Sequence, residues 1–206
     1  MTIWIQITAG RGPDECCLAV AKVASLLALQ AREAGTCLTI LENVEGARSG
    51  TYQSVVFTTE VMPEWLQPWL GTIQWVCTSP YRPGHLRKNW FVAVHVLQQP
   101  EGQVWRPDDV RVDTFKASRP GGQHVNKTAS AVRATHLPSG IMAIAQEGRL
   151  QYDNRRLALD RLKRRLQLQA EQARNNARKH LRGKHDNLER GNSVMVFSGP
   201  NFNRVI

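Results

Sequence analysis

The order of hydrophobic periods along the first hundred residues decides the fold class. Ile3, Ile5 and Ile7 alternate with other residues at the period of a strand. From Asp14 the apolar residues recur every three or four positions, as in an amphipathic helix, and Gly35 supplies a C-terminal stop. Further strands are expected over residues 37–44, 51–58, 72–77 and 89–97, and a short helix over 63–70. This order predicts an α+β fold of the ferredoxin-like type, a sandwich with helices on one face of an antiparallel sheet.

A second unit is expected after residues 98–109, where two prolines and a glycine interrupt the pattern. Its strands are expected over residues 110–115, 131–137 and 140–146. A long helix follows over about residues 154–181, with a single apolar stripe on one side. The stripe consists of Leu159, Leu162, Leu166, Ala170, Ala173, Ala177 and Leu181.

Four segments are therefore predicted. Residues 1–106 form an α/β domain, and residues 107–152 form the core of a small α+β domain. Residues 153–190 form a long basic helical segment. Residues 191–206 are apolar and aromatic again, so this tail is expected to return as a strand to the first domain.

Basic residues are concentrated in the long helical segment. The formal net charge of the chain is +10, and residues 151–190 hold twelve Lys or Arg and five Asp or Glu, a net +7. A solvated helix face is one explanation for such a run. We favour contact with nucleic-acid phosphate, because this excess beside one apolar stripe is greater than solubility requires.

Other functional classes find no support in the sequence. No apolar run approaches the roughly 18 residues of a membrane-spanning helix, and the start lacks the features of a signal peptide. A cytoplasmic location without membrane contact is therefore expected. Cys16, Cys17, Cys37 and Cys77 have no metal-ligand spacing and are expected to be buried thiols. No nucleotide-binding loop appears either, so neither a cofactor nor a metal is predicted.

Two adjacent glycines precede a glutamine at Gly121, Gly122 and Gln123, within the loop after the strand 110–115. Glycine reaches positive φ without strain, so this pair allows an unusual backbone path and a close approach of substrate. The N–H of Gln123 can then stabilise the negative charge of an acyl-transfer transition state. Its side chain does not ionise and cannot act as a general base. Any base must therefore come from the substrate or from a partner.

The run from Asp113 to Gly140, DTFKASRPGGQHVNKTASAVRATHLPSG, resembles the peptidyl-tRNA hydrolysis domain of class I peptide chain release factors. The matching positions are Asp113, Phe115, Ala117, Ser118, Gly121, Gly122, Gln123, His124, Val125, Asn126, Thr128, Ser130, Ala131, Val132, Arg133, Thr135, His136, Pro138 and Gly140. The likeness covers nearly the whole chain. Residues 5–23 and 73–94 are similar to parts of the family's codon-recognition domain, and residues 194–205 to the strand that returns to it.

The resemblance implies that Gly121, Gly122 and Gln123 are the catalytic residues of a loop that enters the peptidyl-transferase centre of the ribosome. There water hydrolyses the ester between peptide and tRNA, assisted by the N–H of Gln123. The ribosome and the peptidyl-tRNA supply the remaining chemistry. The matching glutamine is methylated in this family, so Gln123 is also the expected modification site, and a glutamine methyltransferase is an expected partner.

The chain departs from the family where stop codons are read. Cys77, Thr78 and Ser79 replace the codon-reading tripeptide, and Leu86 stands at the position of a codon-reading histidine. Arg119-Pro120 before the glycines is similar to codon-independent ribosome-rescue hydrolases. Together these features most resemble the release-factor homologues called factor H. That family is linked to an RNA ligase of the RtcB type and to ribosomes damaged in the decoding centre.

RNA contacts are expected in three places. The loop 78–90 interleaves aromatic and cationic side chains, which suits unpaired bases and their phosphates. The alternative for this loop is a surface hairpin with Trp90 in the core. The predicted contact residues are Ser79, Tyr81, Arg82, His85, Arg87 and Lys88 in this loop, Arg119 and Lys127 beside the glycines, and Arg155, Arg156, Arg164 and Arg165 on the long helix.

The leading hypothesis is ribosome-dependent hydrolysis of peptidyl-tRNA, which frees nascent peptide from stalled ribosomes damaged in the small-subunit decoding centre. The partners would then be rRNA at the peptidyl-transferase and decoding centres. One alternative is a stop-codon-dependent termination factor with altered codon reading. Another is a non-catalytic module that binds the ribosome or RNA. The intact Gly-Gly-Gln sequence argues against the latter, because a pure binding module does not need this loop.

Overall fold

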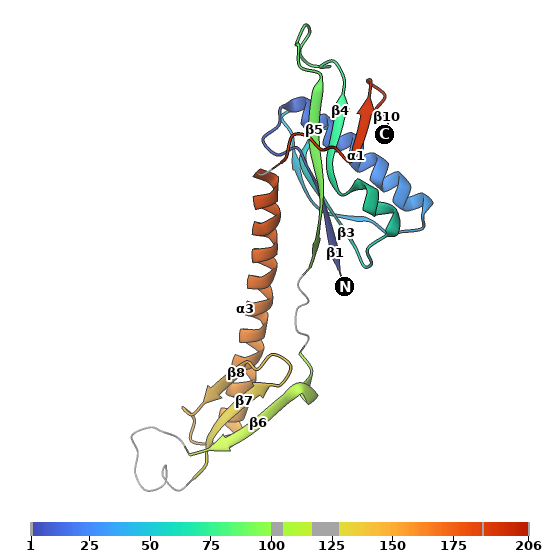
Figure 1. The fold of residues 1–206 in the computed structure, drawn as a ribbon. Coiled ribbons are helices and arrows are strands. Elements are labelled where there is room, and N and C mark those ends of the chain that lie inside the picture. The colour runs from blue at the N-terminus through green and yellow to red at the C-terminus, as the bar shows by residue number, and fades with distance from the viewer. Residues whose placement is uncertain (1, 100–104, 117–127, 187, 206) are drawn as a thin grey trace. The chain divides into compact units, whose positions relative to one another are not determined.

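The computed structural model describes residues 2–99, 105–116, 128–186 and 188–205. The chain divides into two compact units (Figure 1). The first consists of Met1–Gln99 together with Asn176–Ile206, and the second of Pro100–Asn175. The first unit thus takes in the end of the long helix as well as the tail. The division into four segments at residues 106, 152 and 190 stays a prediction.

A seven-stranded sheet runs through the first unit. Its strands are β1 (Ile3–Thr8), β2 (Thr39–Glu45), β3 (Tyr52–Thr59), β4 (Gly71–Val76), β5 (Asn89–Gln98), β9 (Met195–Ser198) and β10 (Asn203–Arg204). Their order across the sheet is β10-β9-β4-β5-β1-β3-β2. The expected antiparallel pairing is confirmed for β1 to β5. Strand β9 is the exception, because it runs parallel to β4.

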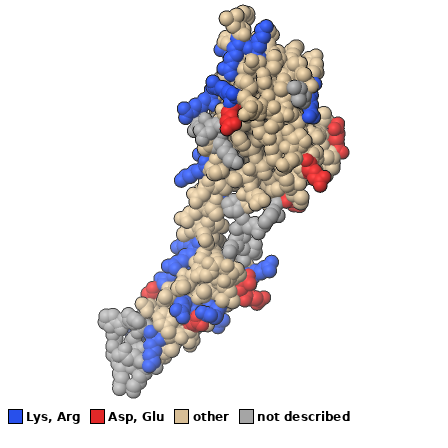
Figure 2. All heavy atoms as spheres, viewed as in Figure 1, with Lys and Arg blue, Asp and Glu red and all other residues tan. Residues whose placement is uncertain are grey.

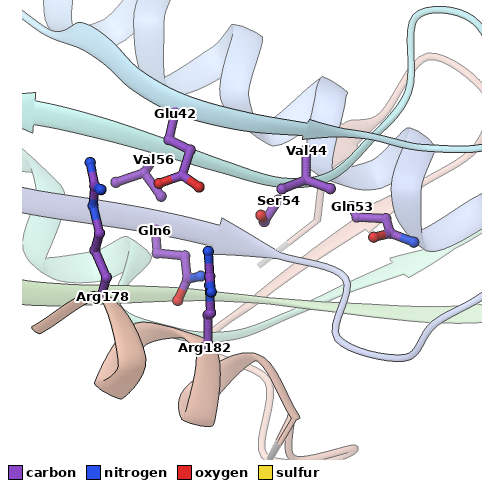
Figure 3. Close-up of a pocket in the computed structure, with 8 residues that line it drawn as sticks. All are labelled: Gln6, Glu42, Val44, Gln53, Ser54, Val56, Arg178 and Arg182. Carbon is purple, nitrogen blue, oxygen red and sulfur yellow. The ribbon is translucent and has the colours of Figure 1, made fainter. Parts of the chain in front are cut away.

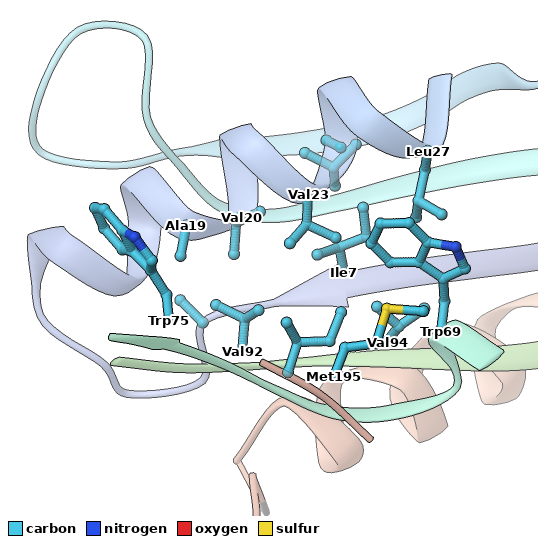
Figure 4. Close-up of a cluster of buried hydrophobic side chains, with 14 of the residues drawn as sticks. Ile7, Ala19, Val20, Val23, Leu27, Trp69, Trp75, Val92, Val94 and Met195 are labelled. Carbon is cyan, nitrogen blue, oxygen red and sulfur yellow. The ribbon is translucent and has the colours of Figure 1, made fainter. Parts of the chain in front are cut away.

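Helix α1 (Asp14–Glu33) covers one face of this sheet. Its first turn carries two carboxylates, whose negative charge interacts favourably with the positive end of the helix dipole. The chain leaves the helix through Gly35 at φ +67°, a conformation that suits glycine. Val20, Val23 and Leu27 point from the helix into a core that also contains Ile7 (Figure 4). The predicted amphipathic helix is therefore confirmed.

The chain after α1 completes the same core. The expected short helix is a 3-10 helix, η1 (Glu64–Trp69), which places Leu66 and Trp69 in the core. The tail adds Phe197 and Phe202, whose rings stack with centroids 4.2 Å apart. The indole N–H of Trp75 donates to the carbonyl of Gly199 at 2.8 Å. Strand β9 and the turn after it are thus part of the core of the first unit.

The opposite face of the sheet is also covered. All six residues of β1 are buried, although a strand points its side chains alternately to the two faces. Trp4 and Val56 pack with Ala177 of helix α3 (Gln151–Asp186) on this second face. The expectation of helices on one face only is therefore wrong. Its physical reason is the second apolar surface around Trp4, which the last turns of α3 cover.

The second unit is built from three strands and the first part of α3. Strands β6 (Val110–Phe115), β7 (Ala131–His136) and β8 (Met142–Ala145) form an antiparallel sheet in that order, after the short 3-10 helix η2 (Pro107–Asp109). Ala158, Leu162 and Leu166 of α3 pack on the small side chains of β7 and β8. The buried stripe thus begins at Ala158, and Leu159 is only partly buried.

Both units mix helices with strands, so the predicted α+β class is confirmed, while the ferredoxin-like label stays a prediction. Within the described ranges, no helix is long and apolar enough to cross a membrane. The expected burial of the cysteines is confirmed for Cys16, Cys17 and Cys77. It is wrong for Cys37, which is exposed in the connection between α1 and β2. Burial raises the pKa of the Cys17 thiol to about 11.

Candidate nucleic-acid interface

The predicted catalytic loop joins two paired strands of the second unit. Gly121, Gly122 and Gln123 lie outside the described residues, as do Arg119 and Lys127. The described parts of the chain show where this segment starts and ends. Phe115 at the end of β6 pairs with Ala131 at the start of β7. The chain therefore leaves and re-enters the sheet at neighbouring positions, which a rigid scaffold can hold in place.

A buried asparagine fixes the returning end of this segment. Asn154, in the first turn of α3, is 0% exposed. Its amide nitrogen donates to the carbonyl of Ser130 at 2.7 Å and to that of Gly148 at 3.0 Å, while its oxygen accepts from the Gly148 N–H at 2.8 Å. A Cβ on Gly148 would lie 2.9 Å from that oxygen, so a larger residue here would displace the Asn154 side chain. Sequence patterns assign Asn154 only to the start of a helix and miss this role.

Helix α3 carries two kinds of cation. Arg155, Arg156 and Arg164 are exposed and have no hydrogen bond or ion pair with any described residue. Arg165, also predicted as an RNA contact, donates through Nη1 to the carbonyl of Met142. Arg161 resembles it, because its Nη1 donates to the Ile144 carbonyl and to the Glu147 carboxylate, each at 2.8 Å.

The arginines bonded within the protein and the solvent-exposed arginines have different roles. Arg161 and Arg165 fasten the helix to β8 through backbone carbonyls, which is a structural role. The hydrogen bond from Arg161 also holds the pKa of Glu147 below its ordinary value. The other arginines keep their guanidinium groups in solvent. Of the four predicted contacts on α3, Arg165 is therefore the one with a partner already in place.

The loop between β4 and β5 is built around a buried tryptophan. Trp90 is 0% exposed, and its indole N–H donates to the Cys77 carbonyl at 2.9 Å. The guanidinium carbons of Arg82 and Arg87 lie 5.6 and 5.0 Å from its ring centroid. The Trp90 ring therefore makes cation–π contacts with the guanidinium groups of Arg82 and Arg87. Trp90 thus lies in the core, as the alternative interpretation expected, and does not offer its ring to bases. Contact of the rest of the loop with RNA stays a prediction.

An ion pair ties this loop to the start of α1. The buried carboxylate of Glu15 accepts two hydrogen bonds from Arg82, through Nε and Nη2, both at 2.8 Å. It also accepts one from the Ser79 hydroxyl at 2.5 Å. Burial raises the pKa of Glu15, but the hydrogen bonds from Arg82 and Ser79 outweigh it and hold the pKa below its ordinary value. Sequence patterns did not single out this carboxylate.

The remaining predicted RNA-contact residues of this loop differ in the solvent exposure of their side chains. Tyr81 is half-buried, with the guanidinium carbon of Arg48 4.3 Å from its ring centroid, and burial raises the pKa of its hydroxyl. His85 is also half-buried, and its Nδ1 accepts from the Arg87 N–H at 3.1 Å. Lys88 is exposed, and Leu86, which was not predicted as a contact, is 94% exposed.

The structure therefore divides the predicted loop contacts into two groups. Ser79 and Arg82 are bound to the buried Glu15. Arg87 is half-buried and donates through Nε to the Asn89 carbonyl, and Lys88 is exposed beside the exposed Leu86. On the face seen in Figure 2, lysine and arginine side chains gather at the end of the first unit that carries this loop. Such a surface attracts nucleic-acid phosphate.

A second site with basic side chains is a cavity between β1, β2, β3 and the end of α3 (Figure 3). Arg178 and Arg182 extend from one side of the helix beside a cavity of about 140 Å³. Gln6 in the floor is 4% exposed, and its Oε1 has no hydrogen-bond partner in the described part of the chain. Glu42 faces the two arginines from β2. Sequence patterns missed this groove, because the burial of Gln6 depends on how α3 docks.

Comparison with known proteins assigns a family. Residues 100–196 match the family model described as the RF-1 domain. Over 204 residues the chain is 42% identical to a peptide chain release factor homologue of Escherichia coli, covering 97% of this chain and 98% of that protein. It is 40% identical over 157 residues to peptide chain release factor 2 of Thermomicrobium roseum, covering 70% of this chain and 41% of that protein.

Among solved structures, release factor 2 of Thermus thermophilus matches with a TM-score of 0.47 at 29% sequence identity, covering 96% of this chain and 57% of that chain. The chain thus spans nearly all of the Escherichia coli homologue but only about half the length of the release factor 2 proteins. Identity of 42% over almost the full length of both proteins settles the predicted membership: the chain belongs to the class I peptide chain release factor family.

Proposed function

We propose that this chain, acting on the ribosome, hydrolyses the peptidyl-tRNA ester and releases nascent peptide from stalled ribosomes damaged in the small-subunit decoding centre. The proposal is supported above all by the Gly-Gly-Gln sequence, which lies within the matched RF-1 domain. The full-length match to a release factor homologue also supports it. The partners would be rRNA at the two ribosomal centres and the peptidyl-tRNA, in the cytoplasm.

The chemistry follows from the residue types of the loop. Gly121 and Gly122 leave room for the ester next to the main chain. The N–H of Gln123 donates to the oxyanion of the tetrahedral intermediate, where one such donor contributes about 2.7–4 kcal/mol. The Gln123 side chain shapes the space for the attacking water and takes no proton. Proton transfer to the departing tRNA hydroxyl is left to the ribosome and the tRNA.

The choice of a damaged ribosome is supported by the loop between β4 and β5. Cys77 is buried and Ser79 is bonded to Glu15, so Thr78 is the one exposed residue of the three that replace the codon-reading tripeptide. Arg87 and Lys88 present cations instead. We infer that this end of the protein binds exposed RNA strands of a broken decoding centre. An RtcB-type ligase would act on the same broken RNA, and a glutamine methyltransferase on Gln123.

A peptide-release assay on ribosomes that hold formyl-methionyl peptidyl-tRNA tests the proposal. Four states are compared: a stop codon, a sense codon, no codon, and a decoding centre cut by a ribonuclease. We expect release from the cut ribosomes and little from the intact ones. Gln123→Pro, which removes the N–H, should bind cut ribosomes but release nothing.

The other outcomes assign the alternative functions. Efficient release from intact ribosomes at stop codons alone would overturn the proposal in favour of a termination factor. Binding without release in every state, by the unaltered protein, would indicate a non-catalytic module. Normal release by Gln123→Pro would remove the N–H from the mechanism.

A further inference from the structure

The cavity between β1, β2, β3 and the end of α3 has charges of opposite sign on opposite sides (Figure 3). Arg178 and Arg182, four residues apart on α3, extend beside it, and Glu42 faces them from β2. All three residues are exposed, and none of them forms a hydrogen bond or an ion pair through its side chain with a described residue. The arginines and the carboxylate therefore lie around one cavity without direct contact. A ligand that joins them needs hydrogen-bond acceptors for the helix and donors for the strand.

The floor of the cavity contains a buried amide that lacks a partner. Gln6 is 4% exposed, and its Oε1 accepts no hydrogen bond from any described residue. A buried acceptor without a partner is destabilising, and a ligand that donates to it recovers this loss. This acceptor is a second indication of a ligand, and it does not depend on the charges around the cavity.

Strand pairing places the polar groups of the sheet in one row. Gln6 of β1 pairs with Val56 of β3, which in turn pairs with Glu42 of β2. Gln6 and Glu42 are thus two strand spacings apart, roughly 10 Å between their backbones. Val56 lies between them and, together with Val44, adds apolar surface to the cavity. A flat ring system can lie on this surface with polar groups of the protein at its edges.

The size of the cavity restricts the ligand to one small ring system. Its volume is about 140 Å³, whereas sites for drug-sized ligands measure roughly 300–1,000 Å³. Unpaired nucleobases are flat, stack on guanidinium groups, and form hydrogen bonds through more than one edge. We propose that this cavity binds an unpaired guanine base of an RNA strand. The inference rests on the proposed function, because that function brings the chain to exposed RNA strands.

Guanine is favoured because of its donors and acceptors. O6 and N7 are adjacent acceptors, which an arginine binds in bidentate fashion. N1–H and the N2 amino group are adjacent donors on the Watson–Crick edge, and the two oxygens of a carboxylate such as Glu42 accept from both. Adenine and cytosine have a single amino group on that edge, and uracil has the N3–H alone. Because the protein occupies the Watson–Crick edge, the guanine must be unpaired.

The test uses the full-length protein and short fluorescent RNAs that contain uridine at every position except one central site. That site holds guanosine, inosine, 7-deazaguanosine, adenosine or uridine, and fluorescence anisotropy gives the Kd of each RNA. We expect central guanosine to bind about tenfold more tightly than uridine, a difference of about 1.4 kcal/mol. Inosine lacks the N2 amino group and 7-deazaguanosine lacks N7, so both should lose most of this preference.

Three variants locate the preference in the cavity. Glu42→Gln and Arg178→Gln each change an exposed side chain and should remove the difference between guanosine and uridine. Gln6→Met replaces the unpartnered amide by an apolar side chain of similar length. It should reduce the preference without lowering Tm, because the Gln6 side chain forms no hydrogen bond with a described residue. A lower Tm together with an unchanged preference would assign Gln6 a purely structural role and overturn its part in binding.

Two further variants are matched controls. Glu45→Gln changes an exposed carboxylate of β2, and Lys179→Gln changes an exposed cation of α3, and neither residue lines the cavity. Both should keep the tenfold preference. Equal Kd values for the guanosine and uridine RNAs, or a preference that survives both Glu42→Gln and Arg178→Gln, would overturn the inference.

Competition with free nucleotides distinguishes the source of the base. GMP at millimolar concentration should reduce the guanosine preference, and AMP should not. Equal competition by both would indicate that the phosphate is bound and would overturn recognition of the base. A lower Kd for GMP than for the guanosine RNA would assign the cavity to a free nucleotide and overturn the choice of RNA. Because these assays involve no ribosome, their failure leaves peptide release from cut ribosomes unaffected, and a failure of release leaves these Kd values unchanged.

Discussion

Glu15 is a buried carboxylate whose described partners are Arg82 and Ser79. Removal of the Arg82 guanidinium leaves this carboxylate buried without a counter-ion, which is worse for stability than removal of both charges. We therefore expect Arg82→Ala to lower Tm more than the double variant Glu15→Gln/Arg82→Ala does. Thermal unfolding at neutral pH, followed by circular dichroism, measures the difference. A double variant with the summed effect of the two single variants would show that the pair is not coupled.

The same carboxylate makes stability depend on pH. The folded-state pKa of Glu15 lies below the ordinary value of 4.5, so the unfolded chain takes up the proton first as the pH falls. The stabilisation is complete above that ordinary value and is lost as the pH falls through the folded-state pKa. Between about pH 5.5 and about pH 3.5, Tm should fall less for Glu15→Gln than for the unaltered protein. Parallel Tm curves would assign the acid sensitivity to other groups.

At the scale of elements, Asn154 links the start of α3 to the last residue before β7. Asn154→Ala removes the buried hydrogen bond to the Ser130 carbonyl and both hydrogen bonds between the Asn154 side chain and the backbone of Gly148. The free energy of unfolding of the second unit should therefore fall by about 1–3 kcal/mol. Peptide release should slow as well, because the returning end of the proposed catalytic loop loses its anchor. Asn175→Ala, an exposed asparagine on the same helix, is the control and should change neither quantity.

The exposed arginines of α3 give a prediction about salt. Replacement of Arg155, Arg156 and Arg164 by Glu removes three free cations. If each contacts a phosphate, the slope of log K against log salt for ribosome binding should decrease by about 0.7–0.9 per arginine, so by about two to three. Charge reversal at the exposed Arg32, Arg106 and Arg204 is the control for net charge. An equal change of slope in both variants would indicate a general charge effect without specific contacts.

The elements themselves were largely predictable, because period two and period three-to-four dominate their sequences. The strands of both units and the two long helices occur where these patterns predict them. The second covered face of the sheet was not predicted, since Trp4 and Val56 pack there with Ala177, which is far along the chain. The roles of Arg161 and Arg165 were hidden for a similar reason. Both arginines donate to backbone carbonyls, and because every residue has a carbonyl, the sequence does not indicate which one accepts.

At the scale of the whole molecule, the proposed chemistry of the Gly121–Gln123 loop follows from its residue types, whereas the roles of the predicted RNA-contact residues depend on tertiary partners. Arg82 and Arg87 belong to the same loop, yet Arg82 is bound to Glu15, whereas Arg87 donates to the carbonyl of Asn89. Trp90 looked like a stacking ring and lies in the core. A charged or aromatic residue is thus assigned a role only when its internal partners are known.

The predicted catalytic loop and the loop between β4 and β5 belong to different compact units, so their contributions to peptide release should be separable. Gln123→Ala keeps the N–H and should lower the maximal rate on cut ribosomes without changing the half-saturating concentration. Leu86→Ala with Lys88→Ala should do the opposite, because these exposed side chains affect binding alone. In the combined variant the two defects should multiply, as expected for independent sites. Titration of cut ribosomes with each variant measures both constants. A lower maximal rate for the Leu86/Lys88 variant at saturation would show that the first unit takes part in catalysis itself.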